Sequence, residues 1–328
     1  MVDADADLVG ALSERLSYEV QVHHGERVEK KSYTVHAALS PVSQLEDVLA
    51  AVDSSILVTT SVRHANLPKV AAVLHQAFAR LSSEANHPHV IACENVRSAS
   101  TELADLIGDE QTVSLDRGYF LNAEVDRICQ TGWSESLSVK TEPYYEWSVE
   151  TPSKDLALNT VSFVADIDSY FDRKRYLVNT VADAIGFLGA ARGHRYLHEA
   201  ASDREILARL EPAVEDLMKY LELQHGFAPQ SLRDYYGTTL RRLQNKGIAR
   251  TLDTVARDLE RKLGAQERFV APALALCERG LEPQGLASLT RTIIDLHPYL
   301  KQKTWSAFWG DDAPARRFAN LVEQARVG

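Results

Sequence analysis

The sequence predicts two domains of different class, an α/β domain over residues 1–155 and an all-α domain over residues 156–328. The first half alternates short β-branched segments with helical ones, which is typical of a sheet covered by helices. From about residue 160 onward the β pattern disappears and long amphipathic stretches follow one another. A chain of 328 residues also exceeds one average domain, so two domains are expected.

In the first domain the expected strands are short and rich in β-branched residues. They are SYEVQV at 17–22, ILVTT at 56–60 and HVIACEN at 89–95. The segment LPKVAAVLHQAFARL at 67–81 has apolar residues at helical spacing and is expected to form a helix. Residues 150–160, ETPSKDLALNT, contain Pro and Ser and form the expected junction between the domains.

The second domain is expected to be a set of packed amphipathic helices. Its clearest helical segments are EILARLEPAVEDLMKYLEL at 205–223, TLDTVARDLERKL at 251–263 and GLASLTRTIIDL at 285–296. Each repeats apolar residues at a spacing of three or four, which gives a helix one buried face.

Composition excludes several classes of partner. The formal net charge of −10 repels nucleic-acid phosphates, so nucleic acid is not expected. No apolar run approaches the ~20 residues that span a bilayer, and the N-terminus MVDADADLVG is acidic where a signal peptide is basic. The three cysteines, Cys93, Cys129 and Cys277, are odd in number and far apart, which fits a reducing compartment. We therefore expect a cytoplasmic protein without a membrane partner or a metal site.

The first residues, VDAD followed by the helical stretch DADLVGALSERL, are similar to the end of the second strand of a dinucleotide-binding βαβ unit. An acid at that point binds the adenosine ribose hydroxyls, which makes Asp3 the expected ribose ligand and Asp5 the weaker candidate. The alternative is a solvated acidic N-terminus.

A strand and a glycine-rich turn should precede such an acid by about 20 residues. The sequence has neither, so we expect an incomplete Rossmann-like domain that lacks its first strand and glycine-rich loop. Either the true reading frame begins further upstream or the loop has been lost. In both cases the chain as it stands is expected to bind NADH weakly.

The segment DSYFDRKRYLVNTVADAIGFLG at 168–189 combines polar candidates with an apolar helix face. At roughly 100° per residue, Lys174 lies at the centre of that face. A lysine there extends past its neighbours to solvent, pairs with a buried acid, or is shielded from water so that it loses its proton more easily. Asn179 lies about 140° around the helix with Ala182 between them. Lys174 and Asn179 can therefore flank a pocket, although an asparagine taken singly is more often a surface or capping amide than a transition-state donor. The apolar side chains within about 60° of Lys174 are Tyr170, Phe171, Val178, Val181, Ile185 and Leu188.

At this segment a family resemblance becomes specific. RKRYLVNT at 173–180 resembles the catalytic helix of the mannitol dehydrogenase family, the polyol-specific long-chain dehydrogenases of the mannitol-1-phosphate 5-dehydrogenase type. The following FLG and the pair Gly193 and His194 keep the same spacing. Further segments occur in family order, namely SYEVQV, ILVTTSV, VIACEN, EVDRI, EPYYEW and ARDLERKL. The resemblance covers nearly the whole chain.

The resemblance implies an NAD-dependent oxidoreductase that interconverts a polyol, such as a sugar-alcohol phosphate, and its keto sugar. Lys174 would be the general base that takes the hydroxyl proton, and Asn179 and Asn95 would donate hydrogen bonds to the developing alkoxide. Asn95, Thr60 and Val62 follow strand ends and would line the nicotinamide side. The acid at the second strand favours NAD over its phosphorylated form, since a carboxylate repels a 2′-phosphate.

A phosphorylated substrate would need a cationic anchor. Arg257 and Arg268, in and after ARDLERKL, best match the family positions, and guanidinium groups bind phosphate in bidentate fashion. The alternative is a solvated helix face on which the cations of this segment pair with Glu260 and Asp258.

One position departs from the resemblance. Family members have a histidine three residues after the asparagine, where this sequence has Ala182, which cannot donate a hydrogen bond. Asp183 is one residue too far along, and surface or core roles are expected for His194 and His198. The second hypothesis is therefore a catalytically impaired relative that acts as a binding or interaction module. A monomer and a homodimer both remain open.

Overall fold

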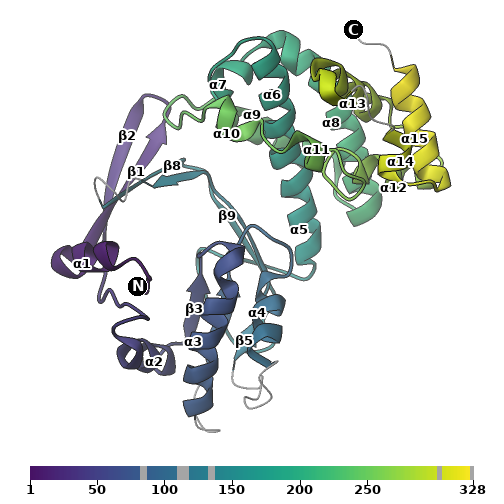
Figure 1. Cartoon of the computed structure of the whole chain (residues 1–328). Coiled ribbons are helices and arrows are strands. Elements are labelled where there is room, and N and C mark those ends of the chain that lie inside the picture. Colours follow the sequence, from purple (N-terminus) through teal and green to yellow (C-terminus); the bar gives the residue numbers. More distant parts are fainter. Residues whose placement is uncertain (82–86, 109–117, 132–136, 301–304, 326–328) are drawn as a thin grey trace. The chain divides into compact units, whose positions relative to one another are not determined.

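The computed structural model describes residues 1–81, 87–108, 118–131, 137–300 and 305–325. They form two compact units, Met1–Phe171 and Asp172–Gly328. The first unit mixes strands and helices, whereas the described part of the second contains helices and no named strand (Figure 1). The predicted fold class, α/β followed by all-α, is confirmed.

The centre of the first unit is a parallel sheet in the order β3 (Leu57–Thr60), β4 (His89–Ala92) and β5 (Tyr119–Phe120). Strand β4 is buried along its whole length. Val90 packs into the apolar cluster under the helices, and Ile91 packs into a second cluster with Val149. Because successive side chains point to opposite faces, β4 needs apolar residues throughout. This explains the unbroken apolar character of VIA.

Helices α2, α3 and α4 contribute Leu49, Leu74, Phe78 and Leu103 to the same cluster as Val90. Their bounds are α2 (Leu45–Asp53), α3 (Leu67–Arg80) and α4 (Ala99–Gly108). Helix α3 and strands β3 and β4 lie where the sequence predicts them.

Two further sheets complete the first unit, in the orders β2-β1-β8-β7 and β10-β9-β6. The predicted strand SYEVQV lies in β1, which pairs antiparallel with β2 and parallel with β8. The prediction that the β pattern ends near residue 160 is wrong by one short strand, since β10 pairs in parallel with β9. A three-residue strand is too short to give a recognisable alternation. The elements are α1 (Ala6–Arg15), β1 (Ser17–His24), β2 (Arg27–Thr34), β6 (Ala123–Asp126), β7 (Cys129–Thr131), β8 (Ser138–Thr141), β9 (Glu146–Glu150) and β10 (Ser162–Val164).

The second unit is organised around the long helix α8 (Arg204–His225). The Asp203 side chain caps its N-terminus by accepting the Glu205 N–H, and Gly226 ends it at φ 71°. The buried face of α8 contacts α13 (Gln284–Leu296) and α6 (Val181–Ala191). The remaining helices are α7 (Leu197–Ala200), α9 (Pro229–Leu243), α10 (Leu252–Val255), α11 (Leu259–Lys262), α12 (Ala271–Glu278), α14 (Trp305–Trp309) and α15 (Ala313–Gln324). Among the described residues, no helix has both the length and the apolarity needed to cross a bilayer.

The predicted continuous helix at 251–263 is wrong. The structure has two short helices, α10 and α11, separated by Asp258 in the left-handed conformation at φ 56°. The Val255 carbonyl oxygen accepts a hydrogen bond from Lys262 Nζ at 3.0 Å. The Val255 carbonyl oxygen therefore has a side-chain partner within the same segment. Asp258 can take the left-handed conformation because aspartate tolerates it better than most residues do.

At the contact of α8 and α13, the Asp216 carboxylate accepts the Leu286 N–H at 2.8 Å. Burial raises the pKa of Asp216 from 3.8 to about 6. The folded state therefore holds this proton more tightly than the unfolded chain does. The stability that this provides is fully present below the unfolded pKa and is lost as the pH rises through about 6.

We therefore expect Asp216→Asn, which is neutral at every pH, to become more stable relative to the native chain as the pH rises. Between pH 5 and 8 the difference should change by about 1 kcal/mol, because solvent screens this partly exposed group. Urea unfolding of both proteins at the two pH values measures it. Asp234→Asn, on an exposed carboxylate, is the control. An equal pH dependence for native protein and Asp216→Asn would contradict the expectation.

Candidate active site

Lys174 and Asn179 lie on one helix that changes type between them. Helix α5 (Ile167–Lys174) ends at Lys174, residues Arg175–Thr180 form a π-helical segment, and α6 follows. The Thr180 hydroxyl donates to the Arg175 carbonyl oxygen, five residues earlier, at 3.0 Å. Short π-helical segments are rare and are frequently found at functional sites.

The π-helical segment changes the angles predicted around this helix. A uniform 100° per residue is wrong from 175 to 180, because i→i+5 bonding places more residues in each turn. Lys174 is partly exposed and not at the centre of a buried face, and Asn179 is also partly exposed. Ala182 is buried. The face itself is buried where predicted at Val178, Val181, Ile185 and Leu188.

The residue after Ala182 carries a buried carboxylate. The Asp183 side chain is only 8% exposed, and Lys262 Nζ donates to its Oδ1 at 2.9 Å. Arg268 Nη1 donates to its Oδ2 at 3.0 Å. Burial raises the pKa of the Asp183 carboxyl, and the two cations oppose this rise. Asp183 therefore connects the helix of Lys174 to the segment of Arg268.

The two predicted phosphate anchors have different surroundings. Arg257 is exposed, with no ion pair among the described residues, whereas the Arg268 side chain is 20% exposed and paired with Asp183. Two cations of this segment pair with acids other than Glu260 and Asp258. Lys262 pairs with Asp183, and Arg261 pairs with Glu267.

At the carboxyl ends of β3 and β4, one buried acid organises the residues predicted to face the nicotinamide. Glu94 Oε1 accepts the Thr60 hydroxyl at 3.0 Å and the Val62 N–H at 2.8 Å. Asn95 follows directly and is exposed. Burial and the neighbouring Glu94 raise the pKa of the Cys93 thiol to about 12, so this thiol stays neutral at physiological pH. Glu94 thus fixes the turn after β3.

The two acids at the N-terminus have different roles. Asp5 caps helix α1, since its Oδ1 accepts the N–H groups of Asp7 and Leu8 at 3.0 and 3.2 Å. Asp3 is exposed, and its Oδ1 accepts the Asp5 N–H at 2.9 Å. Val2 forms a parallel bridge with Leu39, so the backbone before Asp3 has strand character. Asp3 therefore remains the better candidate for a ribose ligand.

The histidines after the helix have structural surroundings, as predicted. His194 Nε2 lies 2.9 Å from the Asp203 carboxylate that caps α8. The His198 ring stacks on Tyr196, with centroids 5.5 Å apart. In the part of the chain that the structure describes, no group of three or more His, Cys, Asp or Glu side chains could hold a metal ion.

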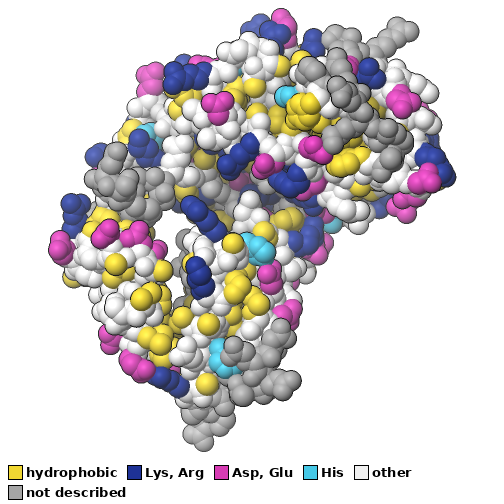
Figure 2. Space-filling model, in the orientation of Figure 1, with side chains coloured by type: hydrophobic (Ala, Val, Ile, Leu, Met, Phe, Trp, Pro, Cys, Tyr) yellow, Lys and Arg dark blue, Asp and Glu magenta, His cyan; other side chains and the backbone are white. Residues whose placement is uncertain are grey.

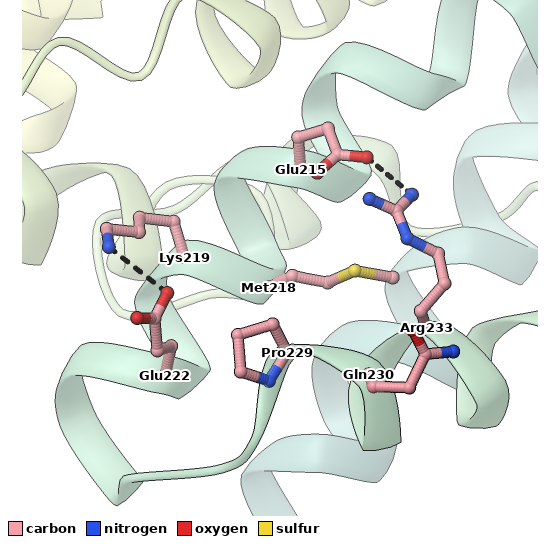
Figure 3. A pocket seen from close by; sticks show the side chains of 7 residues that line it. All are labelled: Glu215, Met218, Lys219, Glu222, Pro229, Gln230 and Arg233. Carbon is pink, nitrogen blue, oxygen red and sulfur yellow. Dashed lines mark hydrogen bonds and ion pairs between the residues drawn. The ribbon is translucent and has the colours of Figure 1, made fainter.

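A surface pocket of about 290 Å³ lies beside α8 and α9 (Figure 3). Lys219 pairs with Glu222 at 3.1 Å, and Arg233 pairs with Glu215 at 2.5 Å. Both cations that line the pocket are thus paired with acids. On the face of this unit that Figure 2 shows, positive and negative side chains are interspersed. None of the predicted site residues lines this pocket, so it is not the candidate active site.

Comparison with protein families establishes the relationship of the chain. Residues 1–160 match the model of the mannitol dehydrogenase Rossmann domain, and residues 166–304 match the mannitol dehydrogenase C-terminal domain. The chain belongs to the mannitol dehydrogenase family. The resemblance seen in the sequence is thereby confirmed.

Individual members of the mannitol dehydrogenase family agree with this. Mannitol-1-phosphate 5-dehydrogenase of Enterococcus faecalis is 31% identical over 99% of this chain and 84% of its own length. The enzyme of the same name from Geobacillus thermodenitrificans is 34% identical over 83% and 73%. Among solved structures, a substrate-free D-sorbitol dehydrogenase has a TM-score of 0.77 at 15% identity, covering 98% of this chain and 84% of that one. Pseudomonas fluorescens mannitol 2-dehydrogenase, solved with NAD and D-mannitol, has a TM-score of 0.70 at 16% identity over 98% and 83%. At 15–16% sequence identity, the structural similarity shows only that the fold is shared.

Sequence reasoning assigned no role to two acids of this mannitol dehydrogenase relative. Glu94 lies inside the quoted motif VIACEN, and an acid directly after a buried strand was the available signal. Asp183 interrupts an otherwise apolar stretch, VADAIGFLG, which indicates a buried charge with a partner. Its partners are 79 and 85 residues away, so the sequence could not identify them.

Proposed function

We propose that this chain is an NAD-dependent oxidoreductase that interconverts a polyol phosphate, such as mannitol 1-phosphate, and its keto sugar. The observation that carries the proposal is the helix on which Lys174 directly precedes a π-helical segment that contains Asn179, within a mannitol dehydrogenase fold. The names of the relatives support a phosphorylated polyol as the substrate.

In this proposal the chain's own residues handle the proton and the oxygen. Lys174 accepts the proton of the carbinol hydroxyl, because that proton does not leave unaided at neutral pH. Asn179 and Asn95 donate hydrogen bonds to the same oxygen as negative charge develops on it. In the reverse direction Lys174 returns the proton to the reduced carbonyl oxygen. Each oriented donor is worth about 2.7–4 kcal/mol in comparable sites.

The residues present fit a nicotinamide dinucleotide. Parallel sheets bind such ligands at the carboxyl ends of their strands, where Glu94 fixes Thr60 and Val62. The exposed Asp3 carboxylate can accept hydrogen bonds from the ribose hydroxyls and would repel a 2′-phosphate. This favours NAD over its phosphorylated form. When bound at these residues, NAD would supply the acceptor for the hydride of the carbinol carbon, and NADH would supply the hydride in the reverse direction.

Arg257 and Arg268 are proposed to bind the substrate phosphate. Arg257 is exposed and can turn toward a ligand, and Arg268 keeps further N–H groups beside the one that binds Asp183. Guanidinium groups suit this role because two parallel N–H groups match two phosphate oxygens.

The test is the oxidation of NADH, followed by its absorbance, with fructose 6-phosphate or fructose as the acceptor. With NADH supplied in excess, because weak cofactor binding is expected, we expect turnover with fructose 6-phosphate, a kcat/KM at least about 10-fold lower with fructose because the phosphate contacts are lost, and a preference for NADH over NADPH. The absence of turnover with ketose phosphates and their polyols would contradict the proposal.

The second candidate function is that of an impaired relative which binds a ligand or partner without turnover. Ala182 favours it, because the methyl group is buried and supplies no donor where the family resemblance expects a histidine. Binding of sugar phosphate without any oxidation of NADH would identify this case.

A further inference from the structure

We propose that Asp183 is a positioning residue that neutralises Lys262 and holds the Arg268 guanidinium in the orientation that binds the anionic group of the substrate. The inference rests on the proposed function, which gives Arg268 its ligand. It adds a residue outside the set that the sequence predicts.

The segment that carries Arg268 is attached to the helix of Lys174 and Asn179 by two hydrogen bonds and one longer contact. The Arg175 side chain donates to the Gln266 carbonyl oxygen at 2.7 Å. The Thr180 hydroxyl lies 3.4 Å from the Arg268 carbonyl oxygen. Asp183 binds the Arg268 side chain itself at 3.0 Å. The Arg175 bond holds the backbone of this segment, and Asp183 holds the guanidinium group.

The contacts of Lys262 leave it unsuited to bind a substrate. Its side chain is 7% exposed, and Nζ donates to Asp183 and to the Val255 carbonyl oxygen. The ammonium group also lies 5.3 Å from the centre of the Phe187 ring. A buried ammonium needs such partners, so Asp183 compensates Lys262. One acid between two cations leaves one positive charge, and that charge suits an anionic ligand.

The other acid near Arg268 cannot replace Asp183. Glu267 Oε2 is 3.8 Å from Arg268 Nε, beyond hydrogen-bonding distance. The same carboxylate also pairs with Arg261 and with Arg175. Without Asp183, the Arg268 side chain would keep its charge and lose its orientation.

Two variants separate positioning from charge. Lys262→Met removes one cation and keeps the pair of Asp183 and Arg268. Asp183→Ala/Lys262→Met removes the acid as well and restores the native net charge. If Asp183 acted only through its charge, the double variant would bind an anion more tightly than Lys262→Met. Positioning predicts the opposite order. The double variant leaves no unpaired buried lysine or aspartate, and thermal unfolding checks that it folds.

We expect the KM for fructose 6-phosphate to rise about 10-fold in the double variant relative to Lys262→Met. Both kcat and the KM for fructose should change less than about twofold, because the bond between Asp183 and Arg268 affects the binding of the phosphate group, which fructose lacks. An equal or lower KM for fructose 6-phosphate in the double variant would overturn the inference.

Inorganic phosphate provides a readout that needs no turnover. Phosphate should raise the melting temperature of the native chain and of Lys262→Met, and this rise should be lost in the double variant. A rise kept in the double variant, or absent in the native chain, overturns the inference. If the native chain reduces no ketose while the phosphate effect follows the expected order, the proposed function fails and the role of Asp183 stands.

Discussion

Replacing Lys174 with methionine is expected to lower kcat for the reduction of fructose 6-phosphate by about 10²- to 10⁴-fold. Methionine keeps the length of the side chain and removes the group that transfers the proton, and general acid–base catalysis contributes this range in enzymes. The KM for the substrate should change far less. Steady-state oxidation of NADH measures both quantities.

Two matched variants make this result specific. Lys219→Met, on the exposed face of α8 where Lys219 pairs with Glu222, should keep the native rate. Asn179→Ala should lower kcat by about 10²- to 10³-fold and keep the pH dependence of the rate, because it removes a donor and leaves the base. Lys174→Met should remove that pH dependence. A rate within about tenfold of the native one in Lys174→Met would refute the proposed base.

The second large effect is expected on stability, from Gly285→Ala at the start of helix α13. A Cβ at this position would lie 2.1 Å from the Pro212 carbonyl oxygen and 2.6 Å from the Ala213 backbone nitrogen. Both atoms belong to the backbone of α8, which cannot move aside as a side chain can. The substitution would push α13 away from α8 and disturb the buried Leu286, Leu289 and Ile293. We expect the free energy of unfolding to fall by about 3 kcal/mol or more.

Gly237→Ala in helix α9 is the matched control. A Cβ there would meet only Arg241 Nη1, at 3.7 Å, which is an ordinary contact. Alanine in a helix interior is favoured over glycine by up to about 1 kcal/mol, so this variant should be as stable as the native chain or more so. Thermal unfolding compares the two variants. A melting temperature for Gly285→Ala within about 2 °C of the native value would refute the predicted clash.

Local patterns were sufficient for most of the fold. The apolar run VIA at 90–92 predicts a buried strand, and LPKVAAVLHQAFARL predicts the helix that covers it, because burial repeats with the period of each element. The prediction of a continuous helix at 251–263 failed because periodicity does not show where the chain turns. Its amphipathic period is present, and the chain still turns at Asp258 while Lys262 turns inward to bonds with Asp183 and Val255.

The candidate site shows the same division. Lys174, Asn179 and Asn95 could be selected from the sequence, because their motifs resemble those of a family and need no coordinates. The angle between Lys174 and Asn179 around the helix could not be predicted, since the π-helical segment at Arg175–Thr180 has no signal in the apolar period.

The sequence by itself thus determined the class of each unit, the mannitol dehydrogenase resemblance and the residues to test first. Only the tertiary structure decided that Asp183 turns inward to Lys262 and Arg268, that Glu94 holds Thr60 and Val62, and that Gly285 must lack a side chain. The physical reason is the separation along the chain between the residues that interact. Periodicity records which side of an element is buried, whereas an ion pair or a close backbone approach depends on residues that folding brings together from distant parts of the chain.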